Sequence, residues 1–219
     1  MKRLKIIKTF FFLLSIMFLA HFSVDTVYAK TYNGWYTVKM GNEIEFQLPP
    51  TLELQSKEYE QIIKDASPLG YLIAYPPGMN RIIAQQKGLN DKILEAFNHY
   101  IRVFVYINDT DIQFPLFGQP LDFTKAELEE LDELISKGPY FVGISTPACI
   151  TEVDGIPCVH MVYNTQYPNK PVAINDVYFF YNGYKFYKIN MMIRSTEYAL
   201  WTSGSNDVRN IVNTLSLIR

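Results

Sequence analysis

Two histidines are the residues best suited to side-chain chemistry after the first 29 positions of the chain. His99 and His160 each lie inside or beside a predicted structured segment, and neither belongs to a zinc pattern such as H-E-x-x-H. Ser145 and Ser195 are available hydroxyls for a hydrolase, but no G-x-S-x-G elbow surrounds them. The sequence therefore assigns no catalytic, cofactor-binding or metal-binding residue, and we expect half-buried structural roles for both histidines.

The two cysteines, Cys149 and Cys158, flank the turn signal at 152–155 between two β-type segments. If all four of these residues form the loop, the cysteines stand directly opposite each other at a distance that a disulfide can bridge. If Asp154 and Gly155 alone form the turn, the pair is diagonal and the reach is poorer. We expect a disulfide in an oxidising compartment, and the alternative is two reduced thiols that pack as small apolar groups.

The first 29 residues have the order of a secretory signal peptide. Four basic residues lie within the first eight positions, and an uncharged, mostly apolar stretch follows at 9–24. That stretch is roughly 24 Å long as a helix, whereas a membrane span needs about 30 Å. Val27 and Ala29 suit the −3 and −1 positions of a signal-peptidase site, so we expect cleavage between Ala29 and Lys30; the alternative is an uncleaved anchor.

Composition limits the partners of residues 30–219, which we expect to form one domain. This part carries 16 basic and 21 acidic residues, a balance of −5, with no basic cluster. A nucleic acid or a stable association with an anionic membrane surface is therefore not expected. The chain is 15% aromatic, which supplies apolar area for a sizeable core. We expect an exported protein, periplasmic or secreted, with no stable membrane span after cleavage.

Hydrophobic periodicity and turn residues predict an α+β fold with a largely antiparallel sheet. At 100–107 both alternating faces are apolar, which indicates a central strand with layers on both sides. Strands are predicted at 35–40, 43–48, 52–55, 71–75, 81–86, 100–107, 177–181 and 184–193, and helices at 58–66, from 90 or 91 to about 97, at 124–137 and from 205 or 206 to about 215.

Two of these elements have specific local signals. Thr124 and Glu127 form a capping box before a helix whose acidic residues read as a solvated face rather than a metal site. Asn182-Gly183 reads as a type I′ turn, which would place Tyr181 opposite Tyr184.

A resemblance follows from the pattern at 82–90, the strand that begins at Tyr100, the segment 193–197, Trp201 and the early strand at 45–49. Together these resemble small exported bacterial proteins with a PsbP-like α-β-α sandwich domain. The resemblance implies helices on both faces of the sheet and a non-enzymatic assembly or partner-binding role. The Cys149/Cys158 hairpin and the loop at 169–171 depart from the pattern.

The functional expectation is a non-catalytic exported domain that binds a protein or cell-surface component of the envelope. The alternative is an exported hydrolase that uses His99 or His160. An excess of tyrosine along the later strands suits either a covered sheet or an exposed binding face: Tyr163, Tyr167, Tyr178, Tyr181 and Tyr184. A cleft that gathers a histidine, a carboxylate and a hydroxyl would favour the hydrolase.

Overall fold

A computed structural model describes residues 29–66, 80–91 and 101–218. The predicted leader, up to residue 28, lies outside the described residues. The same holds for the predicted strand at 71–75, for most of the predicted helix that begins near residue 90, and for His99.

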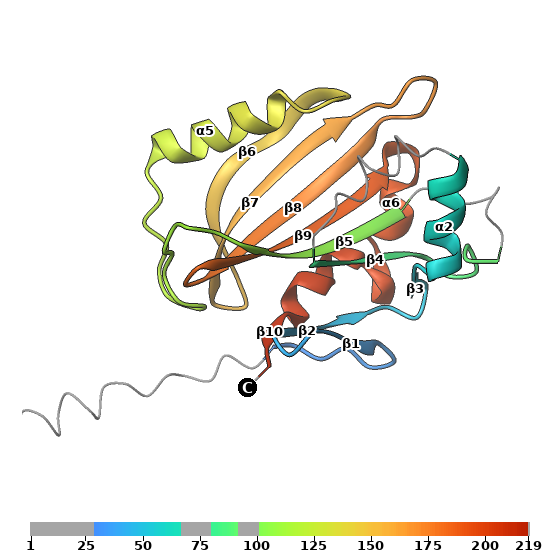
Figure 1. Cartoon of the computed structure of the whole chain (residues 1–219), viewed down its shortest axis with the longest axis horizontal. Coiled ribbons are helices and arrows are strands. Elements are labelled where there is room, and N and C mark those ends of the chain that lie inside the picture. Colours follow the sequence, from blue (N-terminus) through green and yellow to red (C-terminus); the bar gives the residue numbers. More distant parts are fainter. Residues whose placement is uncertain (1–28, 67–79, 92–100, 219) are drawn as a thin grey trace, which may run out of the picture.

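Seven antiparallel strands form the main sheet, in the order β3-β4-β5-β9-β8-β7-β6 (Figure 1). The strands predicted at 52–55, 81–86, 100–107 and in the C-terminal hairpin are confirmed, with small shifts at their ends. The bounds are β3 Leu52–Leu54, β4 Asn80–Gln86, β5 Ile101–Asp109, β6 Phe141–Val153, β7 Ile156–Thr165, β8 Ala173–Asn182 and β9 Lys185–Arg194.

A second sheet of three strands lies beneath the main sheet in Figure 1. The predicted first hairpin is confirmed as β1 (Tyr36–Met40) and β2 (Ile44–Leu48), and Gly41 in its loop adopts a φ of 59°. Near the end of the chain, β10 (Ser216–Leu217) pairs with β2. The N-terminal hairpin and the C-terminal residues are thus joined in one layer.

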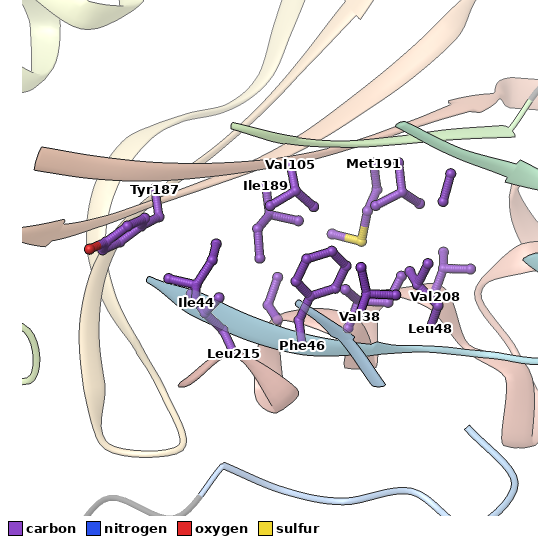
Figure 2. Packing of buried hydrophobic residues seen from close by; sticks show 14 of the residues in the cluster. Val38, Ile44, Phe46, Leu48, Val105, Tyr187, Ile189, Met191, Val208 and Leu215 are labelled. Carbon is purple, nitrogen blue, oxygen red and sulfur yellow. The ribbon is translucent and has the colours of Figure 1, made fainter. Parts of the chain in front are cut away.

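The larger core lies between the two sheets (Figure 2). Alternate residues of β5 and β9 point into it, because successive side chains of a strand point to opposite faces. Val105 and Met191 represent these two strands, and Phe46 of β2 meets them from the other side. Val208 and Leu215, near the end of the chain, close the core.

A smaller core lies on the opposite face of β7 and β8. Helix α5 (Lys125–Ser136) packs there through Leu128, Leu131 and Ile135, and its predicted capping box is present, with Thr124 and Glu127 bonded to each other's backbone N–H groups. The acidic residues of this helix were expected to face solvent, and Asp132 is an exception. Its carboxylate accepts the Ala148 backbone N–H of β6 at 2.9 Å.

Helices on both faces are not confirmed. The face of the main sheet opposite α5 is covered by the three-stranded sheet and by short helical segments that follow β9. These segments are η1 (Ser195–Glu197), α6 (Tyr198–Trp201), η2 (Gly204–Asn206) and η3 (Val208–Thr214). The predicted helix at 58–66 is present as α2 (Lys57–Ala66).

The last helix was expected to start near residue 205 or 206; a short 3₁₀ segment, η2, lies there, and the longer helical segment begins at Val208. It is the 3₁₀-helix η3, capped by Asp207, and it buries Val208, Ile211, Val212 and Thr214. Thr214 faces inward because its hydroxyl accepts the Gln47 N–H of β2 at 2.8 Å. A contact with a distant strand thus anchors the end of this segment.

The C-terminal hairpin also differs in register from the expectation. Asn182 pairs with Lys185 and Tyr181 with Phe186, so the loop is Gly183-Tyr184 and Tyr181 does not face Tyr184. The preceding loop explains the shift. The Asn182 side-chain oxygen accepts the Phe117 N–H at 3.3 Å, and Gly183 exchanges backbone hydrogen bonds with that same loop.

The two edges of the main sheet are irregular or short. Strand β6 forms one edge and is interrupted by three register shifts between Phe141 and Cys149, a stretch that also contains Pro147. Strand β3 forms the other edge and has three residues.

Candidate functional site

A pocket of about 410 Å³ opens where the β6–β7 hairpin meets η3. Its walls come from three parts of the chain that are far apart in sequence. The lining residues are Thr151, Glu152, Val153 and Asp154 of the hairpin, His160 and Tyr178 of β7 and β8, and Asp207, Arg209, Asn210, Val212 and Asn213 on and beside η3. Most of these side chains are polar, so the pocket suits a ligand or partner group that forms hydrogen bonds.

One wall of the pocket is built on a buried ion pair or hydrogen bond between His160 and Asp176. The His160 Nε2 atom lies 2.8 Å from the Asp176 Oδ1 atom, and the Asp176 residue is 5% exposed. Tyr178, directly opposite His160 on β8, stacks on the imidazole with ring centroids 4.4 Å apart. The carboxylate and the tyrosine ring together hold the imidazole in one orientation.

The Tyr178 hydroxyl loses its proton less readily than an ordinary tyrosine. Its pKa is raised above the usual 10.0, first because the group is buried and second because Asp176 lies nearby. The phenol therefore stays neutral at physiological pH and acts at the pocket only as a hydrogen-bonding group.

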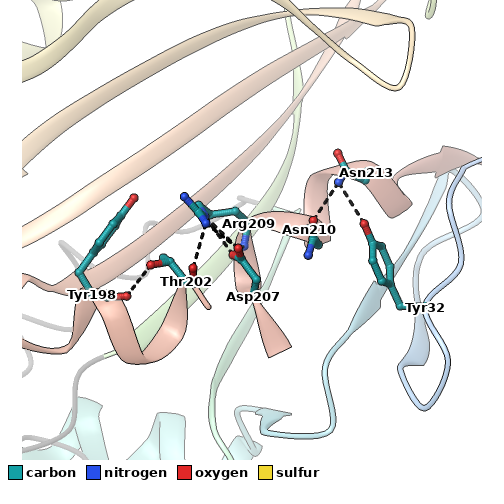
Figure 3. Close-up of polar contacts among 7 residues, drawn as sticks. All are labelled: Tyr32, Tyr198, Thr202, Asp207, Arg209, Asn210 and Asn213. Atoms are coloured by element: carbon teal, nitrogen blue, oxygen red, sulfur yellow. Dashed lines mark hydrogen bonds and ion pairs between the residues drawn. The ribbon is translucent and has the colours of Figure 1, made fainter. Parts of the chain in front are cut away.

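Opposite this wall, Arg209 fastens the start of η3 (Figure 3). Its Nη2 atom donates to Asp207 Oδ2 at 2.6 Å and to the Thr202 carbonyl at 2.9 Å, and its Nε atom also donates to Asp207. The Asp207 hydrogen bond raises the pKa of Arg209 above its usual value. This guanidinium thus positions the backbone that presents Asn210 and Asn213.

Two asparagines of η3, Asn210 and Asn213, line the pocket with side chains that can form hydrogen bonds. The Asn213 side-chain amide donates to Asn210 Oδ1 and to the Tyr32 hydroxyl, each at 3.2 Å (Figure 3). The N-terminal segment therefore reaches the pocket rim. There the Lys30 ammonium lies 3.1 Å from Asp154 Oδ1.

The histidine, carboxylates and hydroxyls of the pocket form an incomplete hydrolase site. Among the described contacts, Asp176 is the one side chain that hydrogen-bonds to the His160 ring, and no hydroxyl or thiol does so. Ser145 accepts the Asn164 amide at 2.8 Å and Ser195 lies in η1, and neither lines the pocket. Among the described residues, no group of three or more His, Cys, Asp or Glu is placed to hold a metal ion.

The two cysteines lie on neighbouring strands beside the pocket, and both are free thiols. The directly opposite arrangement is wrong: Asp154 and Gly155 alone form the turn, with φ values of 50° and 77°, so Cys149 faces His160 and Cys158 faces Thr151. A diagonal pair results, because Asp-Gly suits the positive φ at both positions of a type I′ turn. The expected disulfide is absent from this structure and stays a prediction for an oxidising compartment.

The five tyrosines of the later strands do not form one surface. Tyr163 and Tyr181 belong to the smaller core, Tyr178 faces the pocket, and Tyr167 and Tyr184 are exposed at 39% and 57%. A continuous tyrosine-rich binding face on the sheet is therefore not present in the described part of the chain. Tyr167 instead packs its ring on Tyr140, with centroids 4.4 Å apart.

Asp176 and Arg209 were not predicted as site residues. Neither belongs to a sequence motif, and each becomes meaningful only through pairing across β7–β8 or the fold of η3. One local signal could have pointed to this region of the pocket. Asp207 precedes the apolar residues of η3, and an aspartate at that position is a favourable N-cap.

The fold is of a known class. The structure is similar to the solution structure of cyanobacterial PsbP (CyanoP) from Synechocystis sp. PCC 6803, with a TM-score of 0.50 and 10% sequence identity over 85% of this chain and 94% of that one. The expected PsbP-like fold is confirmed. No protein-family model and no curated protein matches the chain. None of the described helices has the length and apolar character needed to traverse a bilayer.

Proposed function

We propose that this chain is an exported, non-catalytic binding domain that recognises a protein or cell-surface component of the envelope through the polar pocket. The observation that carries the proposal is the pocket itself, in which side chains from the β6–β7 hairpin, β7, β8 and η3 converge. The basic and apolar leader supports export.

The groups that face the pocket favour recognition over catalysis. Arg209 is held by Asp207 and the Thr202 carbonyl, and Asn210 and Asn213 are bonded to each other. Such a preformed hydrogen-bonding surface loses little conformational freedom when a partner docks. Glu152, exposed at the tip of the hairpin, would favour a partner that presents hydrogen-bond donors or a cationic group, and Asp154 beside it is paired with Lys30.

Affinity purification from an envelope extract of the native organism tests the proposal. The bait is the full chain without its leader, and the pocket variant is Glu152→Gln/Asp154→Asn, which removes two charges and keeps a residue that tolerates positive φ at 154. The control variant, Asp122→Asn/Glu130→Gln, removes two exposed charges elsewhere. We expect the same partner with wild type and control, and its loss with the pocket variant. Equal capture by all three would place recognition elsewhere.

The His160–Asp176 pair favours one second candidate, an exported hydrolase. An aspartate that orients a histidine is the arrangement by which hydrolases hold a general base, and Thr151 is a hydroxyl in the same pocket. Turnover of ester or peptide substrates by the purified chain, abolished in both His160→Ala and Thr151→Val, would establish this candidate over the binding domain.

A further inference from the structure

The N-terminal end of the described chain lies against residues that line the pocket. The Lys30 backbone N–H donates to the Asn213 carbonyl at 3.0 Å, and the Lys30 ammonium donates to Asp154 at 3.1 Å. Asn213 lines the pocket from η3, and Asp154 lines it from the β6–β7 hairpin. Lys30 therefore bridges η3 and the tip of the β6–β7 hairpin.

The residues that follow Lys30 keep this bridge in place. The Tyr32 backbone N–H donates to Gln47 Oε1 at 2.9 Å, and its hydroxyl accepts the Asn213 amide at 3.2 Å (Figure 3). The Tyr32 ring stacks on Trp35 with centroids 4.8 Å apart, and the Trp35 indole N–H donates to the Ser205 carbonyl. Lys30 is thus attached to the fold by its own contacts and by its neighbours.

We propose that cleavage of the Ala29–Lys30 peptide bond converts the Lys30 amide nitrogen into an α-ammonium group that stays bound at the pocket rim, so that the processed N-terminus becomes part of the pocket. The inference rests on the proposed export of the chain. A signal peptidase supplies the hydrolysis: water adds to the Ala29 carbonyl carbon, the C–N bond breaks, Ala29 leaves with a carboxylate, and the Lys30 nitrogen takes up the protons.

The change adds one positive charge and two donors at an atom that already contacts the pocket wall. An ammonium donates three hydrogen bonds where the amide donated one, and charge-assisted hydrogen bonds are about twice as strong as neutral ones. The Asn213 carbonyl is in place as acceptor, and the Asp154 carboxylate of the hairpin is already bonded to the Lys30 side chain. Processing therefore strengthens the link between hairpin and η3 and makes the pocket rim less negative.

The native cleavage point is the first test. N-terminal sequencing or mass spectrometry of the protein purified from its envelope is expected to give Lys30 as the first residue. A native chain that begins at any other residue overturns the inference. It leaves the binding function open, since the pocket residues 151–213 are present in each case.

A matched pair of recombinant chains tests the anchoring itself. One begins at Lys30 and the other retains Ala29, which moves the terminal ammonium by one residue, and both are released from a fusion partner without extra residues. We expect a thermal midpoint higher by on the order of 1–3 °C for the Lys30 chain. Its α-amino group should also react several-fold more slowly with an amine-acylating reagent near neutral pH.

Asp154→Asn in both chains separates the rim contact from a general effect of chain length. We expect the difference in thermal midpoint to shrink in this background and to persist in Glu130→Gln, an exposed substitution on α5. Equal midpoints and equal acylation rates for the two wild-type chains would overturn the anchoring. Failure of partner capture, with these differences intact, would instead remove the binding function alone.

Discussion

The buried carboxylate of Asp176 owes its stability to the His160 ring beside it. Burying a carboxylate without a partner costs several kcal/mol. The 2.8 Å contact with the His160 ring offsets this cost, and it is made only when the Nε2 atom points toward Asp176. Cys149, opposite His160, donates its thiol to the His160 carbonyl at 3.6 Å. A carboxylate and a thiol thus both contact His160 of β7, the first at its ring and the second at its carbonyl oxygen.

The two thiols should differ in reactivity. Cys158 is fully buried, and burial raises its pKa to about 12, whereas Cys149 is partly exposed. Because the thiolate is the reactive form, we predict that a thiol-specific reagent labels Cys149 at least tenfold faster than Cys158 in the folded, reduced protein. Cys149→Ser should remove the fast phase and Cys158→Ser should keep it. A reversed assignment would contradict the burial of Cys158.

Gly155 tests the type I′ turn at the pocket rim. Its φ is 77° and a Cβ there would meet no atom within 4 Å, so the cost of Gly155→Ala is backbone strain alone. We predict a loss of about 1–2 kcal/mol in the free energy of unfolding, measured by denaturant titration. Gly143→Ala is the matched control, because Gly143 lacks a positive φ and is equally open. Equal effects would argue against the positive φ at Gly155.

At the scale of elements, local signals were sufficient where neighbours in sequence make the contacts. The capping box of α5 and the hairpin of β1 and β2 follow from residues a few positions apart. Local signals were insufficient where a segment far away in the sequence contacts the element. Gln47 anchors the end of η3 through Thr214, and the loop at Phe117 contacts Asn182 at the point where the register differs. The pocket could not be predicted from local signals either, because its lining brings residues 151–160 together with residues 207–213.

Helix α5 should depend on its N-cap. Thr124→Ala removes the hydroxyl that accepts the Glu127 N–H, and we predict a loss of about 1 kcal/mol, measured by urea unfolding at pH 7. Thr124→Ser should retain most of the stability, and Glu130→Gln, at an exposed position of the same helix, should have little effect. A loss with Glu130→Gln as large as with Thr124→Ala would point to helix charge rather than capping.

The same box predicts a pH dependence. Backbone and side-chain hydrogen bonds from Thr124 lower the pKa of Glu127 below its usual 4.5. Because the pKa is lower in the folded state, ionised Glu127 stabilises the folded protein above about pH 4.5. This stabilisation is lost as the pH falls through the lowered pKa. The stability difference between wild type and Glu127→Gln should therefore shrink on acidification, in unfolding experiments between pH 7 and pH 3. A difference that grows toward low pH would contradict the sign.

At the scale of the whole molecule, the core between the two sheets joins the N-terminal hairpin to the C-terminal strands. Phe46 is 1% exposed at the centre of this contact (Figure 2). We predict that Phe46→Ala costs about 3–5 kcal/mol in the free energy of unfolding, because it removes a buried ring and leaves a cavity. Leu200→Ala, at a side chain that is 69% exposed, is the control and should cost well under 1 kcal/mol.

The interrupted edge strand β6 and the three-residue edge strand β3 bear on how copies of this chain meet one another. An additional strand needs a long, straight row of free backbone groups as a template, and within the described ranges neither edge of the main sheet supplies one. We therefore expect the folded protein to resist polymerisation through the two edges of its main sheet. Contacts between copies at these edges must be made by side chains rather than by backbone pairing.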